Sequence, residues 1–288
     1  MESLREVLAR AMRERWATGH FNFSELDQAR AIVEACAEAR SPAILGTSEG
    51  ERGHVGLTEA VAIRDALRKD FAIPVFLNAD HTKSVAAAKR AIDAGYDSIH
   101  SDLSGYPFEE NAAGTAQVVA YARAKDPLIS LEGEIGYLKG ESKVQNEKFA
   151  VSPDDYTKPE EAKLFTQRTG IDRLAVVAGN IHGISLDEPD LDIARISAIR
   201  ACVGPEIALV LHAGSGIPDE QIRAAIGAGI ANIHINTDMR VAFMNALRHT
   251  LAADPDETAM YKLDASAILA IKAVVKEKLA LFGSMNRI

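Results

Sequence analysis

The sequence predicts an α/β protein folded as a single (β/α)8 barrel, the TIM-barrel architecture. Eight short apolar runs recur along the chain, and a segment with helical spacing of apolar residues follows each run. The runs close on polar residues, as strands do at the catalytic end of a barrel, and 288 residues suit one such barrel. A doubly wound open sheet is the alternative, but it usually has fewer strands and a Gly-rich first turn.

The N-terminal segment, residues 1–17, is predicted to form an amphipathic helix, because apolar residues alternate with Arg and Glu at helical spacing. It has no uninterrupted apolar core, so it is not a signal peptide. No later run approaches the roughly 20 apolar residues that a membrane span needs. Cys36 and Cys202 lie far apart without CxxC spacing, which favours buried thiols in a reducing compartment. We therefore expect a soluble, cytoplasmic protein without a membrane partner.

The predicted strands are short, apolar and bounded by polar residues. They lie at residues 19–23, 43–47, 75–79, 98–102, 128–135, 174–178, 207–211 and 230–235. The helices that follow are predicted from apolar spacing and from stop signals such as Gly95. They lie at residues 25–39, 58–68, 85–94, 111–124, 160–169, 193–202, 219–227 and 238–251, with a C-terminal helix at 265–281. No linker or repeat divides the chain, so we expect one domain over residues 1–288. Its long polar segment, 137–155, is predicted to be an active-site lid.

Asp80 and His81 stand where the third predicted strand gives way to a helix. In barrel enzymes this is where catalytic residues lie, so we expect His81 to bind a metal and Asp80 to move a proton beside it. Polar residues close the other strands in the same way: Asn22, Ser48, Asp102, Glu134, His182, His212 and Asn236. Three imidazoles with an open fourth position suit catalytic Zn²⁺. Asp102 and Glu134 are expected to hold a second metal or to orient the histidines.

Any single histidine is more often structural than a metal ligand. His100 and His234 share the inward strand face but are expected to lie a layer deeper than the metal ligands. His20, His54 and His249 have no companion residues and are expected to be ordinary. His182 and His212 differ, because the small residues that follow each of them let backbone N–H groups approach a ligand.

A small anionic substrate is compatible with this sequence, whereas nucleic acid is not. The net charge of −9 opposes binding to a phosphate backbone, but a few backbone N–H groups can hold one phosphate. The segments 214–220 and 236–238 place Gly, Ser, Thr and Asp at helix starts after the seventh and eighth strands, where barrels often bind phosphate. The same residues also suit simple helix capping, and the two roles are compatible.

With these residues in place, the chain resembles the class II, metal-dependent fructose-bisphosphate/tagatose-bisphosphate (ketose-bisphosphate) aldolases. The resemblance covers almost the whole chain in ordered motifs. They are Phe21-Asn22, Ser41-Pro42, Ser48-Glu49-Gly50, Asp80-His81, Ser98 to Asp102, Glu132 to Gly136, Tyr156 to Pro159, Thr169 to Asp172, His182-Gly183, Leu209 to Gly216, Asn236 to Asp238 and Val275 to Ser284. So many ordered matches make chance similarity improbable.

The resemblance implies a set of roles. Its zinc ligands would be His81, His182 and His212, with another divalent ion as the alternative metal. Asp102 and Glu134 would serve a second divalent site, and Asp80 would be the acid/base at the broken bond. Substrate and phosphate positions would be Asn22, Ser48, Gly183, Ala213, Gly214, Ser215, His234, Asn236 and Thr237. The resemblance also implies a homodimer or homotetramer, a monovalent cation near the phosphate, and a place in carbohydrate metabolism such as glycolysis.

The sequence departs from the family pattern at several positions. Asn78 stands where the family usually has His, and His234 where it commonly has Asn. Ala213 is acceptable if its φ stays negative. Within the lid only Glu141 is a candidate for the catalytic Glu, and Lys262 takes the place of the Arg that binds the distal phosphate.

The expected function is therefore aldol cleavage of a ketose (bis)phosphate resembling fructose 1,6-bisphosphate, which yields dihydroxyacetone phosphate and an aldehyde. A different ketose phosphate, such as tagatose bisphosphate, is the alternative. A non-catalytic barrel subunit is disfavoured because all five metal-ligand candidates are present. A metallohydrolase is disfavoured because the first strand lacks a His-x-His pair.

Overall fold

A closed barrel of parallel strands forms the centre of the protein, as predicted. The computed structural model describes residues 2–144, 152–184 and 190–288. Within these residues eight parallel strands close in the order β1-β10-β9-β7-β5-β4-β3-β2. They are β1 (Thr18–Asn22), β2 (Ala43–Thr47), β3 (Val75–Thr82), β4 (Ser98–Ser101), β5 (Ser130–Ile135), β7 (Arg173–Val176), β9 (Ala208–Leu211) and β10 (Ile230–Ile235).

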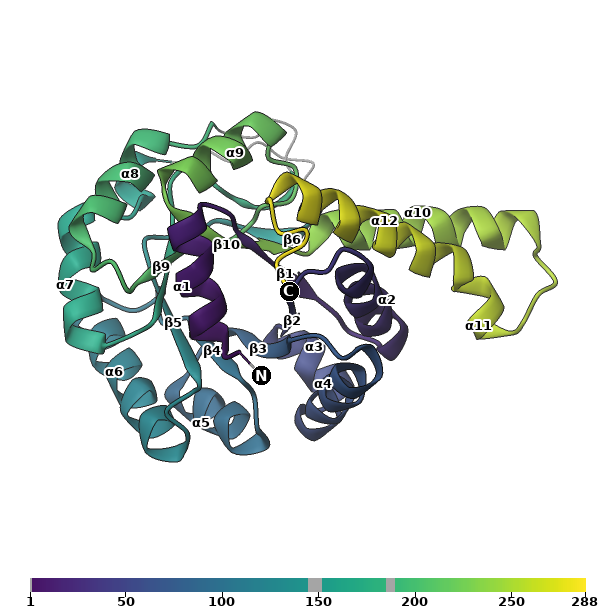
Figure 1. The fold of residues 1–288 in the computed structure, drawn as a ribbon, viewed down its shortest axis with the longest axis horizontal. Helices are drawn as coiled ribbons and strands as arrows, with labels where there is room; N and C mark the ends of the chain where they lie inside the picture. Colours follow the sequence, from purple (N-terminus) through teal and green to yellow (C-terminus); the bar gives the residue numbers. More distant parts are fainter. Residues whose placement is uncertain (1, 145–151, 185–189) are drawn as a thin grey trace.

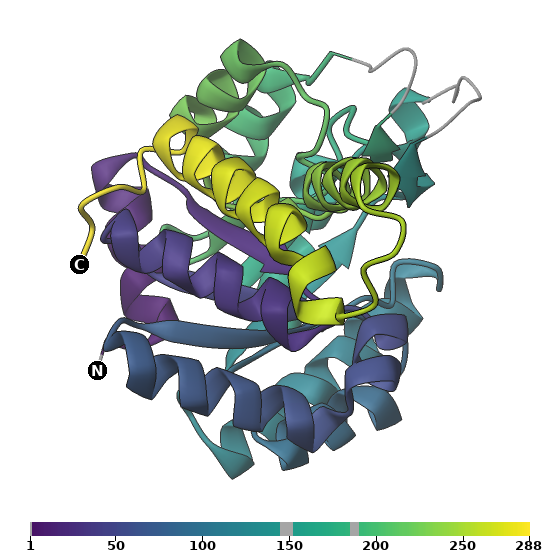
Figure 2. The same ribbon diagram turned by 90° about the vertical axis from the view of Figure 1, so that its right-hand side faces the viewer.

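Helices surround this barrel and cover its apolar outer face (Figure 1). They are α2 (Leu26–Glu38), α3 (Glu49–Val55), α4 (Leu57–Phe71), α5 (Val85–Ala94), α6 (Phe108–Lys125), α7 (Pro159–Thr169), α8 (Ile193–Cys202), α9 (Asp219–Ala228), α10 (Thr237–Ala253), α11 (Met260–Leu263) and α12 (Ala265–Leu281). The predicted C-terminal helix is α12. Helices α10 and α12 project from the barrel as an arm with α11 at its tip, and Figure 2 shows α12 packed beside α2. None of the helices in the described parts of the chain is long and apolar enough to span a bilayer.

Helix α1 (Leu4–Glu14) closes the N-terminal end of the barrel. A capping box between Ser3 and Glu6 starts the helix. Its buried residues pack against Ile44, Phe76, Ala208 and Ala231, which lie at the starts of four barrel strands. The opposite end, where the strands finish, therefore remains for the functional site.

Two strands near that end, and the short helix α3 that follows β2, were not predicted. Strands β6 (Gly140–Val144) and β8 (His182–Ile184) pair in parallel outside the barrel, with Gly140 opposite His182. The sixth barrel strand, β7, ends at Val176, so His182 does not close a barrel strand as the sequence had suggested. Part of the predicted lid at 137–155 lies in β6 and in a 3-10 turn at Pro153–Asp155, while 145–151 lie outside the described residues.

The interior of the barrel is polar beneath the functional end. Barrel interiors are usually filled by layers of Val, Ile and Leu. Here buried polar side chains from several strands fill the interior: Thr18, His20, Asn78, Ser98, His100, Ser130, Glu132, Arg173, Asn232 and His234. Most of these side chains are hydrogen-bonded or ion-paired to one another, so they form a polar network in place of the usual apolar layers, although Ser130 Oγ has no hydrogen-bond partner among the described residues.

Candidate functional site

The site is built around the end of β3. Strand β3 stays in register with β2 up to Ala79, and its pairing with β4 shifts between Ala79 and Thr82. Within this irregularity His81 adopts a left-handed φ of 41°, which is unusual for a non-glycine residue. Backbone strain of this kind is often found at functional sites, where the surrounding structure holds it in place.

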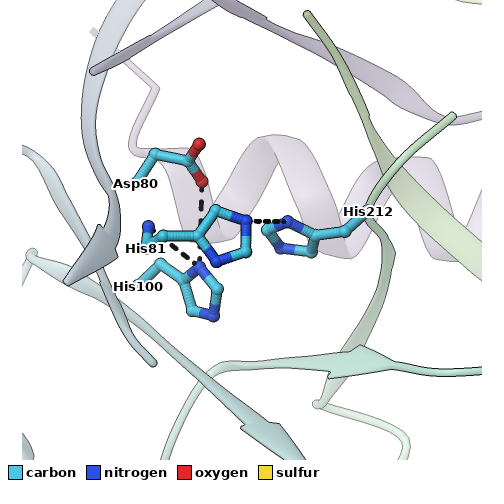
Figure 3. A group of neighbouring side chains, drawn as sticks. All are labelled: Asp80, His81, His100 and His212. Atoms are coloured by element: carbon cyan, nitrogen blue, oxygen red, sulfur yellow. Dashed lines mark hydrogen bonds and ion pairs between the residues drawn. The ribbon is translucent and has the colours of Figure 1, made fainter. Parts of the chain in front are cut away.

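Three imidazoles converge at this point from different parts of the chain. His81 Nε2 lies 3.1 Å from His182 Nε2 and 3.2 Å from His212 Nδ1. Figure 3 shows the rings of His81 and His212 facing each other, with Asp80 and His100 beside them. The three residues predicted as zinc ligands are thus brought together although 101 and 131 positions separate His81 from the other two.

Two carboxylates decide which ring nitrogens carry hydrogen. His81 Nδ1–H donates to Asp102 Oδ2 at 2.8 Å, and His212 Nε2–H donates to Glu132 Oε1 at 2.6 Å. In the neutral rings the nitrogens that face each other, His81 Nε2 and His212 Nδ1, are therefore bare acceptors. Two lone pairs at 3.2 Å repel each other, so either a proton on His81 or a metal ion between the rings stabilises this contact. This donor set fits a divalent metal ion held by imidazole nitrogens, with carboxylates behind them.

The electrostatics of the rings agree with a cation site. Burial, followed by the charge of His81, lowers the pKa of His182 to about 3. Burial and the neighbouring His234 hold the pKa of His212 well below its usual range. Burial opposes protonation of His81, but the Asp80 carboxylate and the bond to Asp102 outweigh it and raise the pKa of His81. One ring therefore accepts a positive charge while its partners stay neutral.

Asp80 lies beside the imidazole cluster, 5% exposed. Its Oδ2 accepts a hydrogen bond from Asn22 Nδ2 at 3.0 Å, and its Oδ1 lies 3.3 Å from His234 Nδ1. Burial alone would raise the pKa of Asp80, but the charge of His81 and the rings of His100 and His234 hold it well below its usual range. The carboxyl group is therefore ionised near neutrality and can accept a proton.

Asp102 and Glu134 lie on the other side of His81. Asp102 Oδ2 also accepts from Lys83 Nζ at 2.8 Å, and Glu134 Oε2 lies 3.2 Å from His100 Nε2. His100 Nδ1 accepts the backbone N–H of His81 at 3.2 Å, so the proton of neutral His100 is on Nε2, facing Glu134. His81, His100, Asp102 and Glu134 together form a group that could hold a second metal ion, although this proton makes His100 a donor rather than a ligand.

A cavity of about 170 Å³ opens above the cluster. It is lined by Asn22, Ser48, Asp80, His81, His182, Gly183, His212, Ala213, Ser215, His234, Asn236, Thr237 and Arg240. Gly214 was predicted at this site but is not among the lining residues. A Cβ on Gly214 would lie 2.6 Å from Ile233 Cγ2, so its role is to let the loop pack on β10.

Two other predicted residues are placed differently. Lys262 lies in α11 on the arm, where its Nζ pairs with Glu257 at 2.7 Å, and it does not line the cavity. Glu141 lies in β6 next to the strand that carries His182, but its side chain is outside the described residues.

The loops after β9 and β10 form one wall of the cavity. Ser215 Oγ accepts the backbone N–H of Asp238 at 3.2 Å, which joins the two loops. Ala213 adopts a φ of 56°, so the condition under which Ala was acceptable here, a negative φ, is not met. Both Ala213 and His81 are therefore left-handed non-glycine residues that line the same cavity.

Sequence reasoning missed several residues of this region. His20 was expected to be ordinary, yet its ring stacks on that of His234 with centroids 3.6 Å apart. Glu51 is buried, and its carboxylate accepts from Asn22 Nδ2 at 2.8 Å and pairs with Arg240 Nη2 at 2.6 Å. Glu132 alone had a usable signal, because alternation along β5 puts it on the same face as Glu134.

Comparisons with known proteins assign this arrangement to a family. The family model described as fructose-bisphosphate aldolase class-II matches residues 2–287. A fructose-bisphosphate aldolase from Geobacillus stearothermophilus is 40% identical, with 99% of this chain and 98% of the relative covered. One from Staphylococcus epidermidis is 38% identical over the same shares of the two chains.

Solved structures agree with the sequence comparisons. The crystal structure of the YdjI aldolase from Escherichia coli K12 matches with a TM-score of 0.81 and 29% identity, covering 99% of this chain and 98% of that one. An aldolase structure from Coccidioides immitis matches with a TM-score of 0.85 and 26% identity over 98% and 96% of the two chains. The barrel, the convergent histidines and these whole-length matches lead to one conclusion: the chain belongs to the class II fructose-bisphosphate aldolase family, whose members are lyases.

Proposed function

We propose that this enzyme is a zinc-dependent aldolase that reversibly cleaves a ketose (bis)phosphate resembling fructose 1,6-bisphosphate into dihydroxyacetone phosphate and an aldehyde. The observation that carries the proposal is the convergence of three ring nitrogens, His81 Nε2, His182 Nε2 and His212 Nδ1, at one point. A divalent ion held by these three rings would polarise the substrate oxygens and stabilise the enediolate left by C3–C4 cleavage.

The proton at the broken bond is assigned to Asp80. In the cleavage direction its ionised carboxylate takes the proton of the C4 hydroxyl as the aldehyde forms, and in synthesis it returns that proton. Asn22 holds one carboxylate oxygen at 3.0 Å, so the group is oriented before the substrate arrives. Its burial next to the imidazole cluster keeps bulk water from competing for the proton.

The phosphate of the dihydroxyacetone half is assigned to the loops after β9 and β10. Ser215, Asn236 and Thr237 line the cavity there, and α10 begins at Thr237. The first-turn N–H groups of α10, apart from that of Asp238, which donates to Ser215, are proposed to hold the anion. Arg240, one turn into α10, also lines the cavity. Its guanidinium is paired with Glu51 and is a further candidate phosphate contact that sequence reasoning had not considered.

Two further roles extend the proposal. Glu141 is proposed as the group that removes the proton from dihydroxyacetone phosphate, supported by the pairing of β6 with the strand that carries His182. A second divalent ion is proposed between Asp102 and Glu134. A monovalent cation near the phosphate loops is proposed from the family resemblance alone. Metal analysis of the purified protein and the Glu141→Gln variant test these roles.

The test of the main proposal is hydrogen exchange at dihydroxyacetone phosphate in D₂O, followed by NMR. Exchange is expected in the metal-loaded protein and is expected to disappear with chelator and in His212→Ala. Exchange that persists in the chelated protein contradicts metal-assisted enolisation. No exchange in the metal-loaded protein contradicts dihydroxyacetone phosphate as the donor.

A different ketose phosphate, such as tagatose bisphosphate, is the second candidate. Two observations favour it. An imidazole, His234, lines the cavity where the family commonly has Asn, and Lys262, at the position of the Arg that binds the distal phosphate, does not line the cavity. Both differences affect the part of the site that would bind the aldehyde half of the substrate. A screen of acceptor aldehydes decides between the two. A clear preference for glyceraldehyde 3-phosphate with fructose stereochemistry excludes the alternative.

We also propose that the enzyme works as a homodimer or homotetramer in the cytoplasm. The arm exposes large apolar side chains, among them Met260 at 68%, Tyr261 at 74% and Leu269 at 64%. Free thiols at Cys36 and Cys202 suit a reducing compartment. Light scattering after size exclusion tests the assembly, and a monomer at micromolar concentration contradicts it.

A further inference from the structure

Arg173, the first residue of β7, lies fully buried inside the barrel at 0% exposure. Arginine is rarely buried to this degree, because its charge must be compensated and its donors satisfied. Its guanidinium contacts side chains from four other strands. They are Glu132 on β5, Asn78 on β3, Ser98 on β4 and Asn232 on β10.

One branch of this hydrogen-bond network runs from Arg173 through Glu132 to the imidazole cluster. Arg173 Nη1 lies 3.0 Å from Glu132 Oε2, and the other carboxylate oxygen, Oε1, accepts from His212 Nε2 at 2.6 Å. Glu132 is itself fully buried, so the guanidinium is the cation that compensates it. The carboxylate is thereby fixed in position, and with it the proton on His212 Nε2.

A second branch of the network runs from Arg173 through Asn232 to His234. Asn232 Nδ2 donates to Thr18 Oγ1 at 3.0 Å, so its Oδ1 faces Arg173 Nη1 at 3.3 Å. The same Oδ1 accepts from His234 Nε2 at 3.2 Å. His234 Nδ1 is then the nitrogen that faces Asp80 Oδ1 at 3.3 Å. The guanidinium therefore orients two rings that line the cavity.

The third branch of the network orients the side chain of Asn78. Its Oδ1 accepts from Arg173 Nη2 at 3.2 Å and from Ser98 Oγ at 2.7 Å, and its Nδ2 donates to His20 Nε2 at 3.1 Å. The ring of His20 in turn stacks on His234. His234 is thus held on its edge by Asn232 and on its face by His20, and both supports trace back to the same guanidinium.

We propose that Arg173 is a positioning residue of the metal centre. Through Glu132 it fixes the orientation and tautomer of His212, so that Nδ1 is presented to the metal, and through Asn232 it fixes His234 beside Asp80. This inference rests on the proposed function, because it requires a metal at the His81, His182 and His212 cluster. It goes beyond that function by assigning the geometry of the centre to a residue that touches neither metal nor substrate.

The test compares Arg173→Met and Arg173→Lys with the control Arg123→Met. Arg123 pairs with Asp172, the neighbour of Arg173 in sequence, at 2.7 Å but lies outside the barrel interior, so the control breaks an adjacent ion pair without touching the network. The measurements are the dissociation constant for Zn²⁺ by chelator competition and the visible spectrum of the Co²⁺-substituted protein. Neither readout depends on catalytic activity.

Arg173→Met is expected to weaken metal binding by roughly 10–100-fold, the usual effect of losing a group behind a metal ligand, and to alter the Co²⁺ spectrum. Arg173→Lys is expected to restore part of the affinity because it keeps the charge but loses the fork of donors. Arg123→Met is expected to lower stability alone. Wild-type metal affinity and an unchanged Co²⁺ spectrum in Arg173→Met overturn the inference, even if its melting temperature falls.

A second variant covers failure of Arg173→Met to fold. Glu132→Gln keeps the volume of the side chain but breaks the link between Arg173 and His212, and it is expected to lose metal affinity by the same factor. Wild-type affinity in both Glu132→Gln and Arg173→Lys overturns the inference. Wild-type protein that takes up neither Zn²⁺ nor Co²⁺ overturns the proposed function itself, so the two failures are distinguishable.

Discussion

Gly46 makes room for His20, and replacing it with Ala tests how tightly the polar interior is packed. An ideal Cβ at this position would lie 2.1 Å from His20 Cε1 and 2.3 Å from Nε2, far inside van der Waals contact. The ring cannot swing aside as a flexible chain end does. Asn78 donates to its Nε2 at 3.1 Å, and His234 stacks on it at 3.6 Å.

The expected cost follows from this geometry. Overpacking a tightly packed interior costs about 1–3 kcal/mol of unfolding free energy. For a chain of this size, each kcal/mol corresponds to roughly 2–4 °C in Tm. The displaced ring is pushed against His234, which faces Asp80, so turnover is expected to fall together with stability.

The assay is a double-mutant cycle with Gly46→Ala, His20→Ala and the double variant, unfolded in urea with chelator present so that metal binding does not contribute. In the absence of the imidazole ring the added methyl has space, so Gly46→Ala is expected to cost almost nothing in the His20→Ala background. The coupling should therefore be about 1–3 kcal/mol, within the range seen for residues in contact.

Gly53→Ala is the matched control for this cycle. Gly53 lies in α3, and a Cβ there has nothing within 4 Å, so the substitution is expected to stabilise the protein by about 0.4–1 kcal/mol. Strictly additive costs in the Gly46 and His20 cycle would refute the steric argument. They would mean that the ring relaxes freely within the barrel.

Three further predictions concern titratable groups. Asn22→Ala removes a hydrogen-bond donor to the Asp80 carboxylate, so kcat/KM should fall roughly 10–100-fold. The pKa of Asp80 should rise, which moves the acidic limb of the pH–rate profile to higher pH. An acidic limb that does not move contradicts the role assigned to Asp80. Because the pKa of His81 is raised, metal binding near neutral pH should displace a proton, and calorimetric heats that are independent of buffer contradict this. Burial raises the pKa of the Cys36 thiol, so iodoacetamide at pH 8 should leave Cys36 unmodified until denaturant is added, as read by peptide mass.

Much of the fold could be predicted because its signals are local. Strands and helices depend on apolar spacing within a few residues, and the predicted barrel with its α12 helix is confirmed. Asp80 and His81 were recognisable because an apolar run ends on them. The pair β6 and β8 was missed, because two short polar strands outside the barrel have no periodicity of their own.

The roles of the site residues stay predictions, although the structure shows which of the predicted residues meet. Alternation along the strands suggested that His100 and His234 face inward, a layer below the metal ligands. Both do lie in the barrel interior, but His234 lines the cavity together with those ligands, so the expectation of a deeper position was wrong for His234. Nothing local indicated that His20 would stack on His234, that Glu51 would hold Arg240, or that Arg173 would be buried. Those contacts join residues that are far apart in sequence.

The barrel, its strand ends and the residue types at them follow from the sequence, because propensity and periodicity act over short stretches of chain. Which nitrogens carry protons, and which groups face one another, depends instead on how the strands are assembled. Closing the barrel places β5, β7 and β10 around one interior, and the resulting contacts set the tautomer of His212 and the orientation of the His234 ring. Hydrogen-bond geometry at this level depends on the positions of whole strands, which no local pattern of residues specifies.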